Sequence, residues 1–286
     1  MDVKPLSIIN FSASALMKAV IFSALSFISL NLSAQSYGEV GVFGGVAYYI
    51  GDLNPGKQFE IVKPAFGGFL RHNFNERLAI NLSGTYGHIA GDDAISGYRT
   101  DRNLNFKSPV TDISATFEIN FFEYFIGSLR HFLTPYMFAG AGTVIFNPQG
   151  KYNGDFYDLQ PLGTEGQNSE IYPDRDPYKR VAFQVPFGIG VKYSLNDFIG
   201  ITANWTMHKT YTDYIDDVSK TYYLDLANSS SSDTGTEGLL SDPTLSHNKD
   251  MQRGDSQNND WYSTAGVSIS IRINYSSHKK CLNTFL

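Results

Sequence analysis

The sequence has little cysteine, little positive charge and few long apolar runs, and each shortage excludes a class of protein. Cys281 is the one cysteine among 286 residues, so the chain cannot form an internal disulfide. Lysine and arginine number 22 against 28 aspartates and glutamates, and the resulting net charge of −6 argues against a nucleic-acid-binding protein. Beyond the N-terminal region no run is apolar over the roughly 20 residues that a transmembrane helix needs. Any membrane crossing there has to use β-strands.

Aromatic residues and glycine are abundant instead, with 18 Tyr, 21 Phe and 26 Gly. Membrane β-barrels use these residue types for their interfacial girdles and for tightly turned β-structure. The mean hydropathy of −0.21 resembles that of a soluble protein, as expected for a barrel, because half of each strand is polar and the loops are hydrophilic. A soluble β-sandwich shares this composition, so the lengths of the strands have to decide between the two folds.

The N-terminal residues 1–34 read as an extension followed by a cleaved signal peptide. Met17 and Lys18 precede an apolar run at residues 19–32 and the small residues Ser33 and Ala34. A basic start, a short apolar core and small residues before a polar one are typical of secretory signals. We expect a signal at about residues 17–34, for which Met17 is a candidate initiator, and a single domain at residues 35–286 that ends in a short tail.

The stretch at residues 261–275 carries the strongest fold signal. Val267, Ile269 and Ile271 alternate with Ser268 and Ser270, and this alternation is the period of a β-strand. Soluble strands usually have about 5–6 residues, whereas a tilted strand that crosses a bilayer needs about 9–11. The length therefore favours a membrane strand, which would close a ring against the first strand.

Seven further segments show strand periodicity, and their connections alternate between short and long. The sequence predicts strands at about residues 39–51, 65–74, 78–88, 110–122, 136–146, 181–193, 199–208 and 261–275. Short links are expected at residues 74–77, 123–134 and 194–198, and long ones at 52–64, 89–109, 147–180 and 209–260. This pattern predicts an all-β fold, an eight-stranded antiparallel transmembrane β-barrel in the Gram-negative outer membrane, with short periplasmic turns and long extracellular loops.

Alternation also assigns the two faces of each strand. Charged residues that would be costly against lipid belong in the polar lumen, and we expect them to form a lumenal cluster of Arg71, Asp112, Glu118, Lys192 and Arg272. In the fifth strand we expect Tyr136, Phe138, Val144 and Phe146 to face outward. Eight strands enclose an interior that side chains largely fill, so an open diffusion pore is not expected.

Two groups of residues could carry chemistry. Asp213, Asp216 and Asp217 gather carboxylates that could hold Ca²⁺, but they lack the spacing of a calcium loop, and a solvated loop is the simpler interpretation. A lipid-modifying enzyme would need a histidine with a hydroxyl or acidic partner, and His72, His88 and His208 lie at strand ends without a recognisable partner in the sequence. We therefore expect no catalytic residue, no metal and no cofactor.

Three pieces of the sequence together resemble a known family. They are residues 38–41 with 49–54, the stretch NWTMHKTYTDYIDDVS at residues 204–219, and the tail at residues 280–285. The chain is similar over its mature length to the Bacteroidetes outer-membrane barrel family that includes PorG, a component of the type IX secretion system.

The resemblance implies a structural role rather than an enzymatic one. The barrel would sit in outer-membrane lipid and contact a periplasmic ring protein or lipoprotein of the secretion and gliding machinery. The family motif, of which Thr212, Asp213, Tyr214, Asp216 and Asp217 are part, falls at the outer rim, so the periplasmic turns and the tail residues Lys279, Lys280 and Cys281 are the better contact candidates. A stand-alone structural or adhesive barrel and an interfacial lipid-modifying enzyme remain the alternatives.

Overall fold

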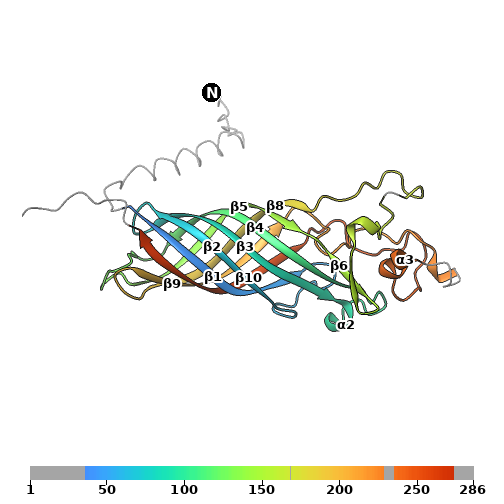
Figure 1. Cartoon of the computed structure of the whole chain (residues 1–286), viewed down its shortest axis with the longest axis horizontal. Coiled ribbons are helices and arrows are strands. Elements are labelled where there is room, and N and C mark those ends of the chain that lie inside the picture. The colour runs from blue at the N-terminus through green and yellow to red at the C-terminus, as the bar shows by residue number, and fades with distance from the viewer. Residues whose placement is uncertain (1–35, 168, 229–234, 274–286) are drawn as a thin grey trace, which may run out of the picture. The chain divides into compact units, whose positions relative to one another are not determined.

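The protein folds as a closed ring of eight long antiparallel strands, as the sequence predicts (Figure 1). The computed structural model describes residues 36–167, 169–228 and 235–273. The ring runs in the order β3-β2-β1-β10-β9-β8-β5-β4, and pairing of β3 with β4 closes it. Its strands are β1 (Tyr37–Ile50), β2 (Lys63–Asn73), β3 (Leu78–Asp92), β4 (Asn105–Asn120), β5 (Leu133–Phe146), β8 (Val181–Ser194), β9 (Ile199–Thr210) and β10 (Trp261–Ile273).

The first and last strands meet in a continuous ladder. Gly38 pairs with Ile273 at one end and Ile50 with Trp261 at the other, so the ring has no free sheet edge at this seam. The expected signal at residues 17–34 and the tail from residue 274 onward lie outside the described residues.

The exterior of the ring is apolar and the interior polar. On β10 the side chain of Ile269 is 53% exposed, whereas the neighbouring Ser268 is 6% exposed. The same alternation continues across the seam, where Val42 is 65% exposed and Glu39 is buried. Outward apolar side chains across the ring form a band that the described residues leave uncovered.

Strand β5 faces opposite to the expectation. Tyr136, Val144 and Phe146 are buried in the interior, and Met137 and Ile145 are exposed on the outside. Both faces of this strand are apolar, so alternation marks two faces without saying which one points inward. The interior accepts the large rings because they lie against glycines of β8: a Cβ at Gly190 would meet Tyr136 and one at Gly188 would meet Phe138.

The connections separate into two kinds at the two ends of the barrel (Figure 1). The turn end, at the left in the figure, carries residues 74–77, 121–132 and 195–198. The loop end carries loop 1 (residues 51–62), loop 2 (93–104), loop 3 (147–180) and loop 4 (211–260). In the part of the chain that the structure describes, no helix has the length and apolar character needed to cross a membrane.

The loops contain structure that the sequence pattern did not reveal. Strands β3 and β4 extend past the expected limits of residues 88 and 110, to Asp92 and Asn105. The loops add α2 (Asp93–Ser96), β6 (Gln149–Tyr152), β7 (Asp155–Asp158), α3 (Thr236–Ser241) and the 3₁₀ turns η1 (Gln160–Leu162) and η2 (Leu226–Asn228). Asp92 caps α2 by accepting from the backbone N–H groups of Ala94 and Ile95.

Candidate functional site

The barrel interior holds a buried network of two carboxylates and two cations. Glu118 Oε2 lies 2.9 Å from Arg71 Nε and 2.6 Å from Lys192 Nζ, and Arg71 Nη1 donates to Glu39 Oε2 at 2.8 Å. Asn73 and Ser270 each donate a further hydrogen bond to Glu39 at 2.8 Å. The network therefore has no net charge, the condition under which buried ions are tolerated.

The lumenal cluster predicted from the sequence included Arg71, Glu118 and Lys192 but not Glu39. Glu39 stands directly opposite Arg71 in the ladder between β1 and β2. Its odd-numbered position places it on the interior face of β1, together with Gly41 and Phe43. That face was the signal that could have identified Glu39.

Asp112 belongs to a second cluster nearer the loop end. It accepts hydrogen bonds from Ser114, from Tyr262 at 3.1 Å and from Gln184. His208 stacks on Tyr262 with 4.2 Å between ring centroids, and its Nδ1 lies 3.4 Å from Asp112 Oδ2. The contacts of Asp112 are thus made with Ser114, Gln184, Tyr262 and His208 rather than with Arg71 or Lys192, and the sequence did not identify these partners.

The three histidines differ in their surroundings. His208 also has its Nε2 3.3 Å from Thr264 Oγ1, so a carboxylate, an imidazole and a hydroxyl lie in series inside the lumen. They line a polar cavity of about 70 Å³, which has room for a few waters. His72 and His88 lie on the outer face, against the rings of Phe74 and Tyr86.

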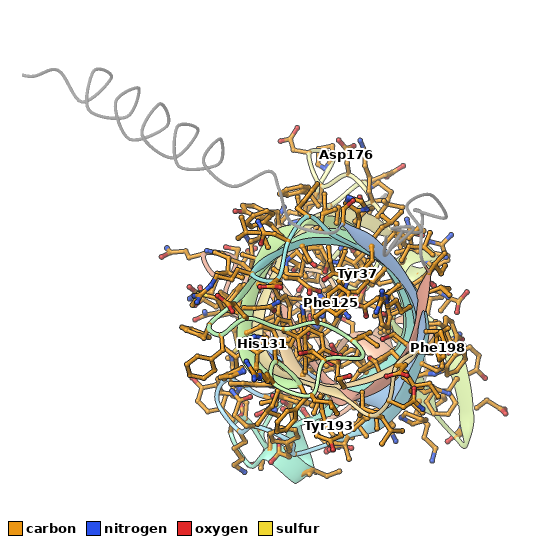
Figure 2. All side chains as sticks on the ribbon, turned by 90° about the vertical axis from the view of Figure 1, so that its left-hand side faces the viewer. Tyr37, Phe125, His131, Asp176, Tyr193 and Phe198 are labelled. Atoms are coloured by element: carbon orange, nitrogen blue, oxygen red, sulfur yellow. The ribbon has the colours of Figure 1, made fainter. Side chains whose placement is uncertain are left out.

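The turn end is closed by residues 121–132, which link β4 to β5. Figure 2 looks at this end and shows Phe125 within the ring of strands. Arg272 holds this segment: it donates to the backbone oxygen of Ile126 at 2.7 Å, and its guanidinium lies 4.2 Å from the Phe125 ring. Gly127 donates to Ser194 Oγ of β8 at 2.8 Å. Arg272 therefore fixes the closure of the mouth.

The loop end is closed by a folded structure that we name the loop cap, formed by loops 1 to 4. Arg102 of loop 2 is buried and makes two hydrogen bonds to Asp93, at 2.7 and 2.8 Å. It also donates to the backbone oxygens of Asp52 in loop 1, at 2.9 Å, and of Arg253 in loop 4, at 2.6 Å. One side chain thus joins three of the four loops.

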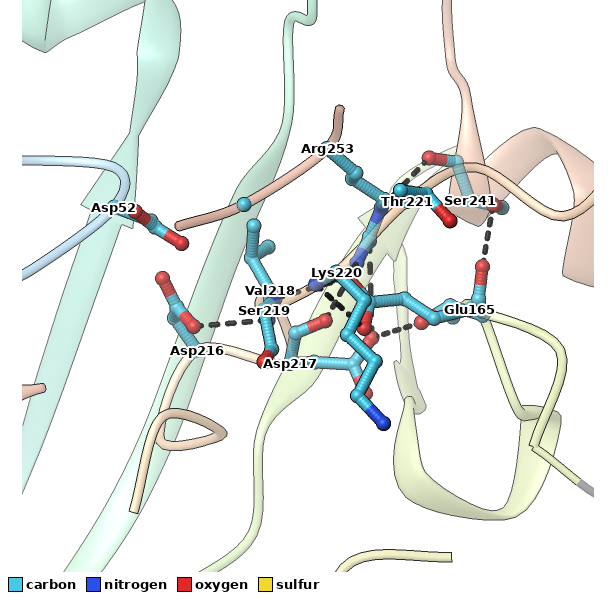
Figure 3. Close-up of polar contacts among 12 residues, drawn as sticks. Asp52, Glu165, Asp216, Asp217, Val218, Ser219, Lys220, Thr221, Ser241 and Arg253 are labelled. Carbon is cyan, nitrogen blue, oxygen red and sulfur yellow. Dashed lines mark hydrogen bonds and ion pairs between the residues drawn. The ribbon is translucent and has the colours of Figure 1, made fainter. Parts of the chain in front are cut away.

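A second buried arginine joins loops 3 and 4 (Figure 3). Arg253 Nη1 lies 3.1 Å from Glu165 Oε1 and donates to the backbone oxygen of Asp217 at 2.6 Å. Its Nε donates to the backbone oxygen of Ser241 at 3.1 Å. Glu165 in turn accepts from the backbone N–H groups of Ser219 and Lys220. Together with Arg102, this arginine ties all four loops into one unit.

The family-motif residues lie inside this cap, and the interpretation of their carboxylates as a solvated loop is wrong. Asp213, Asp216 and Asp217 are all buried. Asp217 accepts from Tyr178 and from Thr164, and Tyr214 stacks on Tyr178 with 4.5 Å between centroids. Thr212 accepts from the backbone N–H of Asp260 through its carbonyl oxygen. The motif is a packing centre of the cap.

Burial perturbs the acids of the motif. Loss of solvation raises the pKa of Asp217 to about 6, although the Arg253 guanidinium counteracts the shift. Burial and the nearby Asp260 raise the pKa of Asp213 to about 9. Among the described residues, no three acidic, histidine or cysteine side chains are grouped so that they could hold a metal ion. The tail residues Lys279, Lys280 and Cys281 lie outside the described residues.

Comparison with known proteins gives distant structural likenesses and one family. The outer-membrane protein OprG of Pseudomonas aeruginosa is 10% identical over 85% of this chain and 100% of its own, with a TM-score of 0.36. Ail, the attachment invasion locus protein of Yersinia pestis, is 8% identical over 84% of this chain and 99% of its own, with a TM-score of 0.41. No curated protein matches the sequence. The sequence model of the family described as "Domain of unknown function (DUF6089)" matches residues 17–235, most of the chain, and the chain belongs to this family.

Proposed function

We propose that the protein is a non-enzymatic outer-membrane barrel that serves as a structural anchor of the type IX secretion and gliding machinery. The observation that carries the structural part of this proposal is closure at both ends. Residues 121–132 cross one mouth, and the arginine-linked loop cap covers the other. A barrel built in this way is suited to holding a position in the membrane rather than to passing solutes.

Location in the outer membrane rests on the surface of the barrel. Outward side chains such as Ile269 and Val42 are apolar and more than half exposed, whereas the interior carries the charges. A closed antiparallel ring satisfies the backbone hydrogen bonds that lipid cannot satisfy. Membrane fractionation of the native envelope tests this part, and recovery in the soluble periplasmic fraction would contradict it.

The contact surface for a periplasmic partner is proposed at the turn end. In bacterial outer-membrane barrels the short turns face the periplasm. Leu129 at the tip of the β4–β5 connection is 96% exposed, and it borders a groove that Leu195 and Asp197 also line. The tail that follows β10 carries Lys279 and Lys280, and we assign both to the same contact on the basis of the family resemblance.

A pull-down from detergent-solubilised native envelope, with mass spectrometry of the captured proteins, tests the secretion role. Recovery of periplasmic ring lipoproteins is expected, and Leu129→Asp should reduce it several-fold. Ile95→Asp, at an apolar site of the loop end that is 57% exposed, is the control and should leave recovery unchanged. Recovery of the barrel alone, under conditions that preserve other envelope complexes, would favour a stand-alone structural or adhesive barrel.

The lipid-modifying alternative has one specific observation in its favour, the series of Asp112, His208 and Thr264 in the lumen. Its cavity of about 70 Å³ lies in the interior, whereas a lipid substrate would approach from the outer wall. Replacing His208 by glutamine should therefore leave the lipid composition of the envelope unchanged, and a changed lipid profile would revive this alternative.

A further inference from the structure

The loop cap contains two carboxylates that share one tyrosine hydroxyl. The hydroxyl oxygen of Tyr49, at the end of β1, lies 2.5 Å from Asp216 Oδ2 and 2.7 Å from Asp260 Oδ1. All three side chains are buried. The remaining oxygens are occupied, because Asp216 Oδ1 accepts from the backbone N–H of Val218 and Asp260 Oδ2 from that of Ile215.

Counting hydrogens leads to the inference. A tyrosine hydroxyl has one hydrogen and can donate it to one carboxylate only. The other short O···O contact needs a hydrogen on the carboxyl group, because two lone pairs facing each other at this distance repel. We infer that Asp216, Tyr49 and Asp260 retain one extra proton between them, and that its loss as the pH rises releases the loop cap.

No neighbouring cation replaces this proton in the described cap. Arg102 interacts electrostatically with Asp216 from a distance, but its ion pair is with Asp93 and its other hydrogen bonds are to backbone oxygens. Arg253 makes its ion pairs with Glu165 and Asp217. The other charged groups that face the pair are Asp52 of loop 1 and Asp213 of loop 4, both acidic.

Asp213 adds a further buried carboxyl group beside the pair, and burial together with Asp260 raises its pKa to about 9. The cap therefore carries more carboxylates than its cations balance. Deprotonation adds like charges in a site that water does not reach, and such a site is expected to open.

The pKa shifts of Asp216 and Asp260 determine whether the closed cap becomes more or less stable as the pH rises. Burial raises the pKa of Asp260 to about 8, and burial together with Asp260 and Asp52 raises the pKa of Asp216 well above its ordinary value. In the opened cap both groups return toward the usual value of about 3.9. A pKa that is higher in the closed form means that closure is most stable at low pH and weakens as the pH rises. Each retained proton changes the opening constant about tenfold per pH unit.

Hydrogen exchange of the full-length protein in detergent measures this directly. The amides of Ile215 and Val218 donate to the two carboxylates, so their protection reports on cap opening. After correction for the intrinsic pH dependence of exchange, the opening constant should rise about tenfold or more per unit between about pH 6 and pH 8. Because this measurement concerns the cap alone, its outcome does not depend on whether the protein acts in secretion.

Asp216→Asn is the decisive variant. Its amide N–H can donate permanently to the Tyr49 oxygen and so take the place of the proton. The factor by which the opening constant rises per pH unit should therefore be about tenfold smaller than in the wild type. Asp260→Asn should have the same effect and guards against poor folding of the first variant. Asp176→Asn, at an exposed aspartate of loop 3, should leave the slope unchanged.

Three results would overturn the inference, two of them in the pH dependence. One is a wild-type opening constant that stays flat from pH 6 to 8, and the other is an unchanged slope in both asparagine variants. Protection that depends on added Ca²⁺ would also contradict it, since a cation rather than a proton would then hold the carboxylates together.

Discussion

Replacing Glu118 by glutamine tests whether the barrel interior depends on balanced charge. Glu118 Oε2 contacts Arg71 at 2.9 Å and Lys192 at 2.6 Å, and Glu39 pairs with Arg71 on its other side. Two carboxylates and two cations cancel, so removing one carboxylate leaves a buried positive charge. Breaking a buried pair in this way costs about 3–5 kcal/mol of unfolding free energy.

The same network supplies a compensating variant. Adding Lys192→Met to Glu118→Gln removes the surplus cation and leaves Arg71 paired with Glu39. Because an apolar side chain of similar size can replace a buried ion at little cost, the double variant should recover most of the loss. The two substitutions are in contact, and strong non-additivity is therefore expected.

Urea unfolding of the barrel in detergent micelles, followed by tryptophan fluorescence, measures these differences. Glu123→Gln is the matched control, because this glutamate lies half-exposed at the turn end, with Arg77 3.9 Å and the His131 ring 3.5 Å away. It should lose less than about 1 kcal/mol. A Glu118→Gln loss equally small, or a double variant as unstable as the sum of its single changes, would refute the charge-balance explanation.

Three further substitutions test the outer wall, the strand ladder and the loop cap one at a time. Ile269→Arg places a charge on the apolar band and should cost about 2–4 kcal/mol if the site lies at mid-bilayer, whereas Ile269→Leu should be nearly neutral in the same unfolding assay. Gly188→Ala puts a Cβ against a backbone oxygen of β9 and should lower the unfolding midpoint, while Gly44→Ala, with no atom within 4 Å of its Cβ, should not. Arg253→Met should make loop 4 sensitive to limited proteolysis while the barrel stays folded, and a resistant loop would contradict the role of this arginine in the cap.

The ring of strands could be predicted because its signal is local. A strand exposed to apolar surroundings on one side and to a polar lumen on the other must alternate with period two. The expected strand at residues 199–208 corresponds to β9 at Ile199–Thr210, and the short and long links fall where the alternation of turns and loops requires.

The orientation of β5 could not be predicted, because its two faces are both apolar. Small outward residues such as Ala139 and Ala141 gave a weaker apolar signal than the inward Tyr136 and Phe146. Space for the inward rings of Tyr136 and Phe138 comes from Gly190 and Gly188 of the neighbouring strand β8, which the pattern of β5 alone does not contain.

The loop cap was not predictable for a different reason, which is the distance of its partners in the chain. Tyr49 meets Asp216 and Asp260 at separations of 167 and 211 residues. Arg102 reaches the backbone of Arg253 across 151 residues. Loop sequences have no period that links such positions, and their aspartates resemble ordinary turn residues. These aspartates are buried and hydrogen-bonded rather than solvated, and their burial can be seen only in the folded chain.

The Glu118 network and the loop cap therefore differ in their charge balance. The Glu118 network is neutral with every group ionised, so its stability should vary little over the pH range in which carboxylates stay charged and lysine stays protonated. The cap has more buried carboxylates than its arginines balance, so it needs protons to remain closed. Raising the pH should consequently loosen the loop end while the ring of strands stays intact. A barrel that holds its position in a membrane can tolerate such a change, because the ladder from β1 to β10 does not depend on the cap for closure.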